Sequence, residues 1–303
     1  MAFYDSIQGH GSSGRARALL MHAPRQPLPP AQRAYRISII VYFVALRVAA
    51  CFALLPQFFS WYSLGAMAIT LSFTVLGITV GYHRMLSHKS FSAHIFVERL
   101  LVWLGTWAIQ RGPLQWVGIH RYHHRFADQS KDPHDIQRGL WWAHVSWLFH
   151  DVPCLREVSV YAPDIQADPF YRWLSRWYLL PQLFIGWLLY ILANHYSWPG
   201  GGAGILLWVF AVRLSLCYDI VFSVNSVAHR FGYRNFDSPD LSTNCWWVAL
   251  LTFGEGWHNN HHAFPGSARF GLRPHELDIG WLFIRGLAQL NLVRDIHVAP
   301  LIR

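Results

Sequence analysis

The sequence predicts an all-α membrane protein in which four transmembrane helices carry a cytoplasmic helical cap rich in histidine. Three observations predict this fold class. Only 14% of the 303 residues are charged and 53% are hydrophobic, whereas a soluble domain carries about a quarter charged residues. Four apolar segments approach the roughly 20 residues that a membrane-spanning helix needs. Eighteen histidines outnumber the 16 acidic residues and cluster beside these segments.

The four expected spans cover residues 37–55, 64–82, 177–193 and 205–224. Residues 100–109 are also apolar but too short to span, and the chain continues into Arg111, Gly112 and Pro113. Because proline and glycine end helices, we expect a buried or interfacial helix there.

The chain is expected to contain one integral-membrane domain over residues 33–303. Residues 1–32 are rich in Gly, Ser and Pro, carry basic residues, and lack the apolar core of a secretory signal. This composition predicts a flexible basic cytoplasmic tail. Four scattered cysteines predict neither a disulfide framework nor a thiolate metal site.

Basic residues predict the orientation. Five arginines precede the first span, whereas the links at 56–63 and 194–202 contain no Lys or Arg. Because Lys and Arg concentrate in cytoplasmic loops, both termini and the long link between the second and third spans are expected to be cytoplasmic. Of the ionisable residues inside spans, we expect Arg47 to face the bundle interior and pair with protein groups. For Asp219, pairing and a functional role both stay open.

Histidines form three clusters, which are His83 with His88, His120 with His123 and His124, and His258 with His261 and His262. Residues i, i+3 and i+4 share a helix face, so each triplet can offer several imidazoles to one small volume. The i+5 pair diverges by about 140° on a regular helix, so His83 and His88 need a helix end between them or two different ions.

All nine candidate histidines, counting His229 at the end of the fourth span, are expected on the same side of the membrane. His195, in an outer link, cannot join them. Neutral imidazole suits iron, zinc or copper. Nine imidazoles exceed what one ion can hold, so the pattern predicts two metal ions.

Four stretches resemble the membrane-bound fatty-acid desaturase family, and the likeness covers nearly everything after the tail. They are GITVGYHRMLSHKSF, QRGPLQWVGIHRYHH, VNSVAHRFGYR and LLTFGEGWHNNHHAFPGSARFGLR. The resemblance is strongest to the Δ9 acyl-CoA and acyl-lipid desaturases. It implies that the cap carries a di-iron site with two Fe²⁺ ions, O₂ as co-substrate, and a cis double bond placed in a long-chain saturated acyl group.

The resemblance also implies a ligand set. Nine histidines would bind the two irons, and Asn225 would act through a bound water; the nine are His83, His88, His120, His123, His124, His229, His258, His261 and His262. The division of these ligands between the irons stays open.

Substrate and electron partners follow from charge. The net charge is +9, and a basic cytoplasmic face can hold the phosphates of coenzyme A or a lipid head group. The predicted substrate contacts are Arg84, Arg121, Arg138 and His134. Asp128, Asp132 and Asp135 follow the second cluster and can orient ligand histidines or contact substrate.

The chain has no flavin, haem or iron–sulfur motif, so two electrons per turnover must come from a separate ferredoxin- or cytochrome-type donor with its reductase. A nucleic-acid partner is not expected, because the basic residues sit between membrane segments. The alternatives are an acyl hydroxylase or acetylenase on the same scaffold, a non-redox membrane metal-binding protein or metal transporter, and a haem-binding membrane protein.

Overall fold

The computed structural model describes residues 30–151, 154 and 158–302, with side chains from residue 33 onward. The chain divides into two units, residues 1–35 and 36–303, and everything below concerns the second. Most of the predicted tail lies outside the described residues.

Helices dominate the described residues, as predicted. The elements are α2 (Pro30–Phe52), η1 (Pro56–Phe58), α3 (Trp61–Leu76), η2 (Gly77–Ser87), β1 (Ser92–Ala93), α4 (Ile95–Gly105), η3 (Thr106–Ala108), α5 (Pro113–Phe126), η4 (Ile136–Arg138), α6 (Leu140–His144), η5 (Ser146–Phe149), α7 (Val158–Tyr161), α8 (Pro163–Ala167), α9 (Pro169–Arg176), α10 (Leu180–His195), α11 (Gly201–Leu206), η7 (Leu207–Val212), α12 (Arg213–Ser226), η8 (Val227–His229), α13 (Trp246–Leu251), α14 (His258–Ala263), α15 (Ile279–Gln289) and β2 (Val293–Arg294).

Three helical segments in the described chain are long and apolar enough to cross a membrane, namely Arg33–Phe52, Trp61–Ser87 and Gly201–His229. They correspond to the first, second and fourth predicted spans. The second and fourth are longer than predicted, at 27 and 29 residues, because the helix continues into the histidine clusters.

The third predicted span, residues 177–193, corresponds to α10, which begins at Leu180 and is too short to span alone. Only together with α9, which meets it at an angle of 62°, does α10 reach the length and hydropathy of a span. Asp168 caps α9 by accepting a hydrogen bond from the Phe170 amide at 2.8 Å. Pro181 stands in the first turn of α10. Proline is tolerated in the first turn of a helix but not in its interior, so α10 cannot continue the helix of α9 through this residue. The structure therefore has three candidate spans, or four if the bent pair counts as one.

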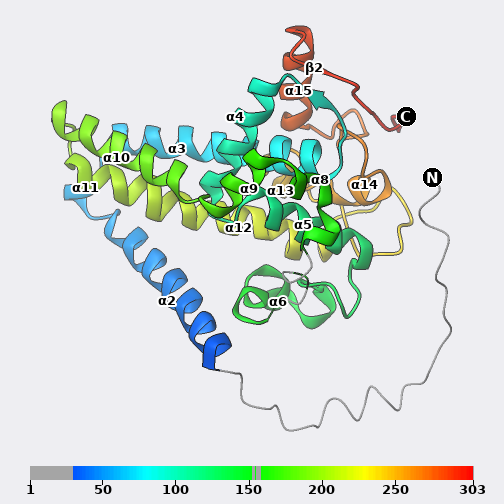
Figure 1. Ribbon diagram of the computed structural model, residues 1–303, viewed down its shortest axis with the longest axis horizontal. Helices are drawn as coiled ribbons and strands as arrows, with labels where there is room; N and C mark the ends of the chain where they lie inside the picture. Colours follow the sequence, from blue (N-terminus) through cyan, green and yellow to red (C-terminus); the bar gives the residue numbers. More distant parts are fainter. Residues whose placement is uncertain (1–29, 152–153, 155–157, 303) are drawn as a thin grey trace. The chain divides into compact units, whose positions relative to one another are not determined.

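Figure 1 shows α3, α10 and the α11–α12 helix side by side. A fully buried arginine, Arg213, joins them at their centre. Its guanidinium donates to Thr74 Oγ1 at 2.7 Å, to the Trp107 carbonyl at 3.0 Å and to Gln182 Oε1 at 2.8 Å. A charge at this depth is tolerated because neighbouring helices satisfy its donors.

The short apolar segment expected at residues 100–109 forms α4 and η3, shifted toward the N-terminus. α4 buries Val97 and Leu101 and exposes Ile95 and Phe96. Apolar side chains therefore lie on both its buried and its exposed face, and it packs the buried face against η2. The contact is close because both helices have glycine there: a side chain on Gly77 would overlap the backbone of Gly105.

The C-terminal quarter of the chain returns to the end of η2. β1 and β2 pair antiparallel, with Ser92 opposite Arg294. The buried Arg84 side chain of η2 donates to the Ala268 carbonyl at 2.8 Å and pairs with Asp278 at 3.0 Å. This packing brings α14 to the same region as η2 and α5.

Candidate metal centre

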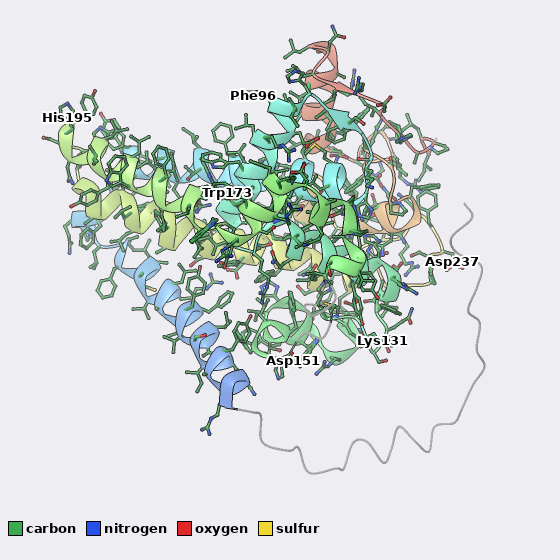
Figure 2. The ribbon with its side chains drawn as sticks, in the orientation of Figure 1. Phe96, Lys131, Asp151, Trp173, His195 and Asp237 are labelled. Carbon is green, nitrogen blue, oxygen red and sulfur yellow. The ribbon has the colours of Figure 1, made fainter. Side chains whose placement is uncertain are left out.

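The nine predicted histidines lie together and form two adjacent groups. The five-histidine group comprises His83, His88, His120, His124 and His261, and the four-histidine group comprises His123, His229, His258 and His262. Within each group one ring nitrogen per residue lies within 4.8 Å of all the others. His195 is elsewhere: Figure 2 shows it at the end of α10, far from the segments that carry Lys131 and Asp237.

A π-helical turn brings His83 and His88 together. Residues Gly77–Ser87 are π-helical, and the His88 amide donates to the His83 carbonyl at 3.2 Å, an i→i+5 bond. In this geometry five residues make about one turn, so the two side chains leave on the same side. Both therefore join the five-histidine group, with ring centroids 4.9 Å apart. The sequence analysis considered a regular helix and a helix end, but not this turn.

The triplets on α5 and α14 are each divided between the two groups. On α5, His120 and His124 belong to the five-histidine group and His123 to the other. On α14 the pattern is reversed. His258 and His262 belong to the four-histidine group, and His261 to the five-histidine group. The side chains at i and i+4 leave the helix in similar directions and stay in one group. The side chain at i+3 lies about 100° around the helix from that at i+4, so it joins the other group.

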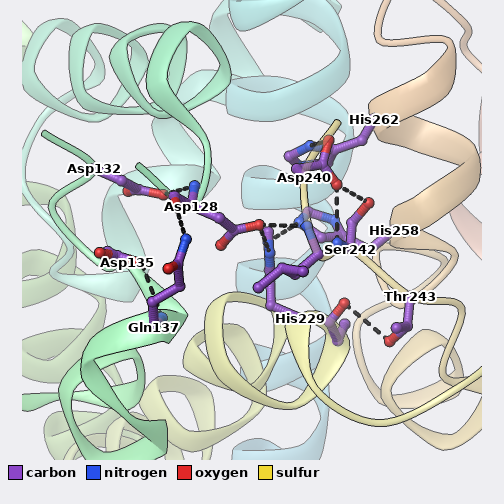
Figure 3. A network of polar contacts seen from close by, with 12 residues as sticks. Asp128, Asp132, Asp135, Gln137, His229, Asp240, Ser242, Thr243, His258 and His262 are labelled. Atoms are coloured by element: carbon purple, nitrogen blue, oxygen red, sulfur yellow. Dashed lines mark hydrogen bonds and ion pairs between the residues drawn. The ribbon is translucent and has the colours of Figure 1, made fainter. Parts of the chain in front are cut away.

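Four of the nine imidazoles contact a carboxylate through Nδ1, which leaves their Nε2 atoms to serve as metal ligands. His123 contacts Asp132 at 2.8 Å, His229 contacts Asp128 at 3.0 Å and His262 contacts Asp240 at 3.0 Å. His83 pairs with Glu255 in the same way. Figure 3 shows Asp128 and Asp240 beside their histidines. Such partners fix the ring orientation and raise the basicity of the nitrogen that binds metal.

Burial sets the protonation of these rings. Burial, reinforced by neighbouring histidines, lowers the pKa of five of them well below its ordinary value: His88, His120, His124, His258 and His261. Burial also lowers the pKa of His262 to about 4 despite the opposing effect of Asp240. These imidazoles are neutral at neutral pH, and the neutral form is the one that binds metal.

His123 is the exception, because Asp132 outweighs burial and raises its pKa. The Asp132 carboxylate thus favours the protonated form of this ring, whereas metal binding requires the neutral form.

The donor atoms fit metal ions better than they fit one another. His262 Nε2 is buried and has no hydrogen-bond partner among the described residues. Other Nε2 atoms face each other directly, at 2.8 Å for His88 and His120 and 3.0 Å for His229 and His258. A buried polar atom without a partner costs free energy. Two groups of converging imidazole nitrogens therefore match two ions of the kind that imidazole binds, such as iron, zinc or copper.

A small cavity of about 50 Å³ touches both groups. His83 and His120 from one group and His123 and His258 from the other line it. The remaining lining is mainly apolar and comes from α3, η2, α5, α12 and the segment between α13 and α14, with Val75, Ile78, Thr79, Trp116, Val221, Val224, Asn225, Thr252 and Glu255. Asn225, one helical turn before His229, lines the same cavity as these four histidines.

The four residues predicted to contact substrate lie in different settings. Arg84 is 0% exposed and is held by Asp278 and Glu255. Arg121 donates to Asp164 at 2.7 Å and to the Leu86 carbonyl at 2.7 Å. Both guanidinium groups thus pair with protein groups, and their contact with substrate stays a prediction.

His134 and Arg138 lie beside α5. His134 is buried, with its ring 4.3 Å from that of His123. Arg138 lies over the Trp142 ring and lines a second cavity of about 520 Å³ together with Lys131. Asp135 accepts a hydrogen bond from the Gln137 amide at 2.9 Å and forms no ion pair with a histidine of the described residues.

Two carboxylates at the centre were not predicted, Glu255 and Asp240. Glu255 pairs with His83, 172 residues away along the chain, so no local spacing signals this contact. Asp240 lies in the loop after η8 and reaches His262 through the fold, where no spacing rule applies. The roles of Asp128 and Asp132 toward His229 and His123 agree with one of the two alternatives considered for them.

Apolar spans that end in two adjacent groups of imidazoles define a membrane protein built around a double metal-binding centre. The family model described as fatty acid desaturase matches residues 59–281. The sn-1 stearoyl-lipid 9-desaturase of Synechocystis sp. is 42% identical over 264 residues, which cover 87% of this chain and 80% of that protein. The Delta-9 acyl-lipid desaturase 1 of Arabidopsis thaliana is 37% identical over 267 residues, covering 87% and 84%.

The acyl-CoA C20 Delta5-desaturase of Anemone leveillei is 38% identical over 262 residues, covering 86% of this chain and 81% of that protein. The chain therefore belongs to the fatty acid desaturase family, as its histidine clusters predicted.

Proposed function

We propose that this desaturase introduces a cis double bond at carbon 9 of a long-chain saturated acyl group carried by a membrane lipid. The observation that carries the proposal is the cavity in which four histidines from both groups face apolar side chains. An unactivated methylene offers no acidic proton, so it must meet an oxidising centre in an apolar space. Names of the relatives at 42% identity support the lipid and the position.

Two iron ions, bound by the nine histidines with Asn225 acting through water, would supply the oxidising power together with O₂ and two external electrons. The chain's own residues bind and orient. Val75 and Ile78 on one side and Val221 and Val224 on the other would hold the acyl chain. Trp116 stacks on His120 at 5.1 Å between ring centroids, so it would keep water away from that ligand.

The site belongs to the cytoplasmic side in this proposal. In it α9 and α10 count as one broken span, which gives four spans, and the histidines belong to a cap. The distribution of Lys and Arg between the links supports placing this cap on the cytoplasmic side. A transporter would place its ligands near the middle of the bilayer, whereas His83 and His229 stand at the ends of their spans. The electron donor would be a separate ferredoxin- or cytochrome-type protein.

The test is expression in a host that lacks the corresponding fatty acid, followed by fatty-acid profiling. We expect a new cis-9 monounsaturated acid, absent from a His261→Ala variant that accumulates to the same level. Mass spectrometry of the product separates the reactions: a desaturase removes two hydrogens, whereas a hydroxylase adds one oxygen. Supplying the acyl group only as acyl-CoA to purified protein tests the carrier, and efficient turnover there would contradict the lipid proposal.

A further inference from the structure

The two histidine groups differ in their surroundings more than in their ligands. In the four-histidine group three of four rings hold a carboxylate at Nδ1, from Asp128, Asp132 and Asp240. In the five-histidine group only His83 holds one, and among the described residues no carboxylate forms an ion pair with the other four rings.

Positive charge increases this difference. Glu255, the one carboxylate on the five-histidine group, is shared with the guanidinium of Arg84 at 3.5 Å. Arg121 pairs with Asp164 at 2.7 Å and donates to the Ser87 carbonyl at 2.9 Å, so its positive charge lies next to the segment that carries His88. The three aspartates of the other group have no Lys or Arg ion-pair partner in the described chain.

Solvent access points the same way. Three of the five residues, His88, His120 and His124, are only partly buried as whole residues. In the four-histidine group only His262 is partly buried as a residue, and its ring nitrogen Nε2 is buried. By this whole-residue measure the five-histidine group is the less deeply buried of the two.

We propose that the two centres are unequal, so that the four-histidine group binds its ion tightly and the five-histidine group is the weaker, exchangeable centre. The inference rests on the proposed function only in requiring that both groups bind metal. One carboxylate partner of a ligand histidine changes metal affinity by about 10–100-fold. Two additional partners therefore outweigh the single additional imidazole.

The test uses the full-length protein in detergent micelles, stripped of metal and titrated with Co²⁺ against a competing chelator. Bound Co²⁺ is counted by elemental analysis and followed by its visible absorption. We expect two Co²⁺ per chain with dissociation constants at least about tenfold apart. Asp132→Asn and Asp240→Asn should weaken the tighter step by about 10–100-fold, and Glu255→Gln only the weaker step.

Two controls secure the assignment. Asp168→Asn removes a carboxylate that caps α9 and pairs with Arg99 at 2.6 Å, and it should change neither step. If a carboxylate variant fails to fold, ligand variants replace it: His88→Ala should retain the tighter ion, and His258→Ala only the weaker one.

Two Co²⁺ ions bound with equal constants would overturn this inference and leave the proposed function standing. The same holds if Asp240→Asn weakens the weaker step. Binding of fewer than two ions by the wild-type chain would contradict the proposed function itself.

Discussion

Arg47 on α2 and Asp219 on α12 form a two-pronged ion pair, with Nη1–Oδ2 at 2.9 Å and Nη2–Oδ1 at 2.5 Å. Both residues lie inside candidate spans. His144 of α6 adds a third contact to Asp219 at 3.6 Å. The expected pairing of Arg47 with a protein group is therefore found, and Asp219 is the group that provides it.

Replacing one partner of this ion pair should destabilise the protein more than replacing both. Asp219→Leu leaves an uncompensated arginine in a membrane helix, at a cost of about 2.5–3.5 kcal/mol. The double variant Arg47→Leu/Asp219→Leu should recover most of that loss, since replacing a whole ion pair is often close to neutral. Thermal denaturation in detergent measures both; a double variant less stable than either single one would contradict this account.

The close approach of η2 and α4 gives a second prediction. Gly77→Ala places a methyl group into the backbone of Gly105 and Leu104, and overpacking of this kind costs about 1–3 kcal/mol. Gly65→Ala on α3 is the matched control, because no atom lies within 4 Å of its added methyl group. The control should be neutral or stabilised by up to about 1 kcal/mol. Equal effects of the two variants in thermal denaturation would refute the packing argument.

The cavity predicts how substitutions change the reaction. Val221→Phe fills space that we assign to the acyl chain, so desaturation of an 18-carbon chain should fall by about 10-fold or more, equivalent to about 1.4 kcal/mol in the barrier. Leu216→Phe on the same helix is exposed and should leave the product yield unchanged. Fatty-acid profiling at matched protein levels checks both, and unchanged yield in Val221→Phe would place the chain elsewhere.

Asp164 predicts a pH dependence. Burial raises the pKa of this carboxyl, but hydrogen bonds from Arg121 and Lys89 outweigh it and hold the pKa well below its ordinary value. The ionised form is favoured by folding, so Asp164 stabilises the protein above the unfolded-state pKa of about 3.9, and this stabilisation is lost as the pH falls further.

The stability difference between wild type and Asp164→Asn should therefore be constant near neutral pH and shrink below about pH 4. Denaturation midpoints across pH 3–7 measure it. A difference that grows on acidification would mean that the carboxyl is protonated in the folded protein.

The parts of the site that could be predicted from sequence are those governed by local geometry. The i, i+3 and i+4 spacings identified the residues of α5 and α14, and the span ends placed His83 and His229 beside them. The partition between groups could not be read, because it depends on how α5 and α14 face each other. The i+5 pair required a π-helical turn, and such turns have no simple sequence pattern.

Of the fold, the apolar runs predicted the spans but not their limits. The second and fourth continue past the last apolar residue because the histidine clusters are buried in protein, where polarity does not stop a helix. The third begins at the bend between α9 and α10, and the sequence did not show that α9 would lie before it as part of the same candidate span. Asp240 and Glu255 were missed since each reaches its histidine through tertiary packing rather than along one helix.

The crossed allocation of α5 and α14, in which each short helix supplies both groups, has a mechanical consequence. Each helix should move as one rigid body, and it carries side chains of both histidine groups. A translation or rotation of α5 or α14 would move both histidine groups together and leave the distance between the groups nearly unchanged. Any conformational change during lipid entry would therefore have to take place in the surrounding loops.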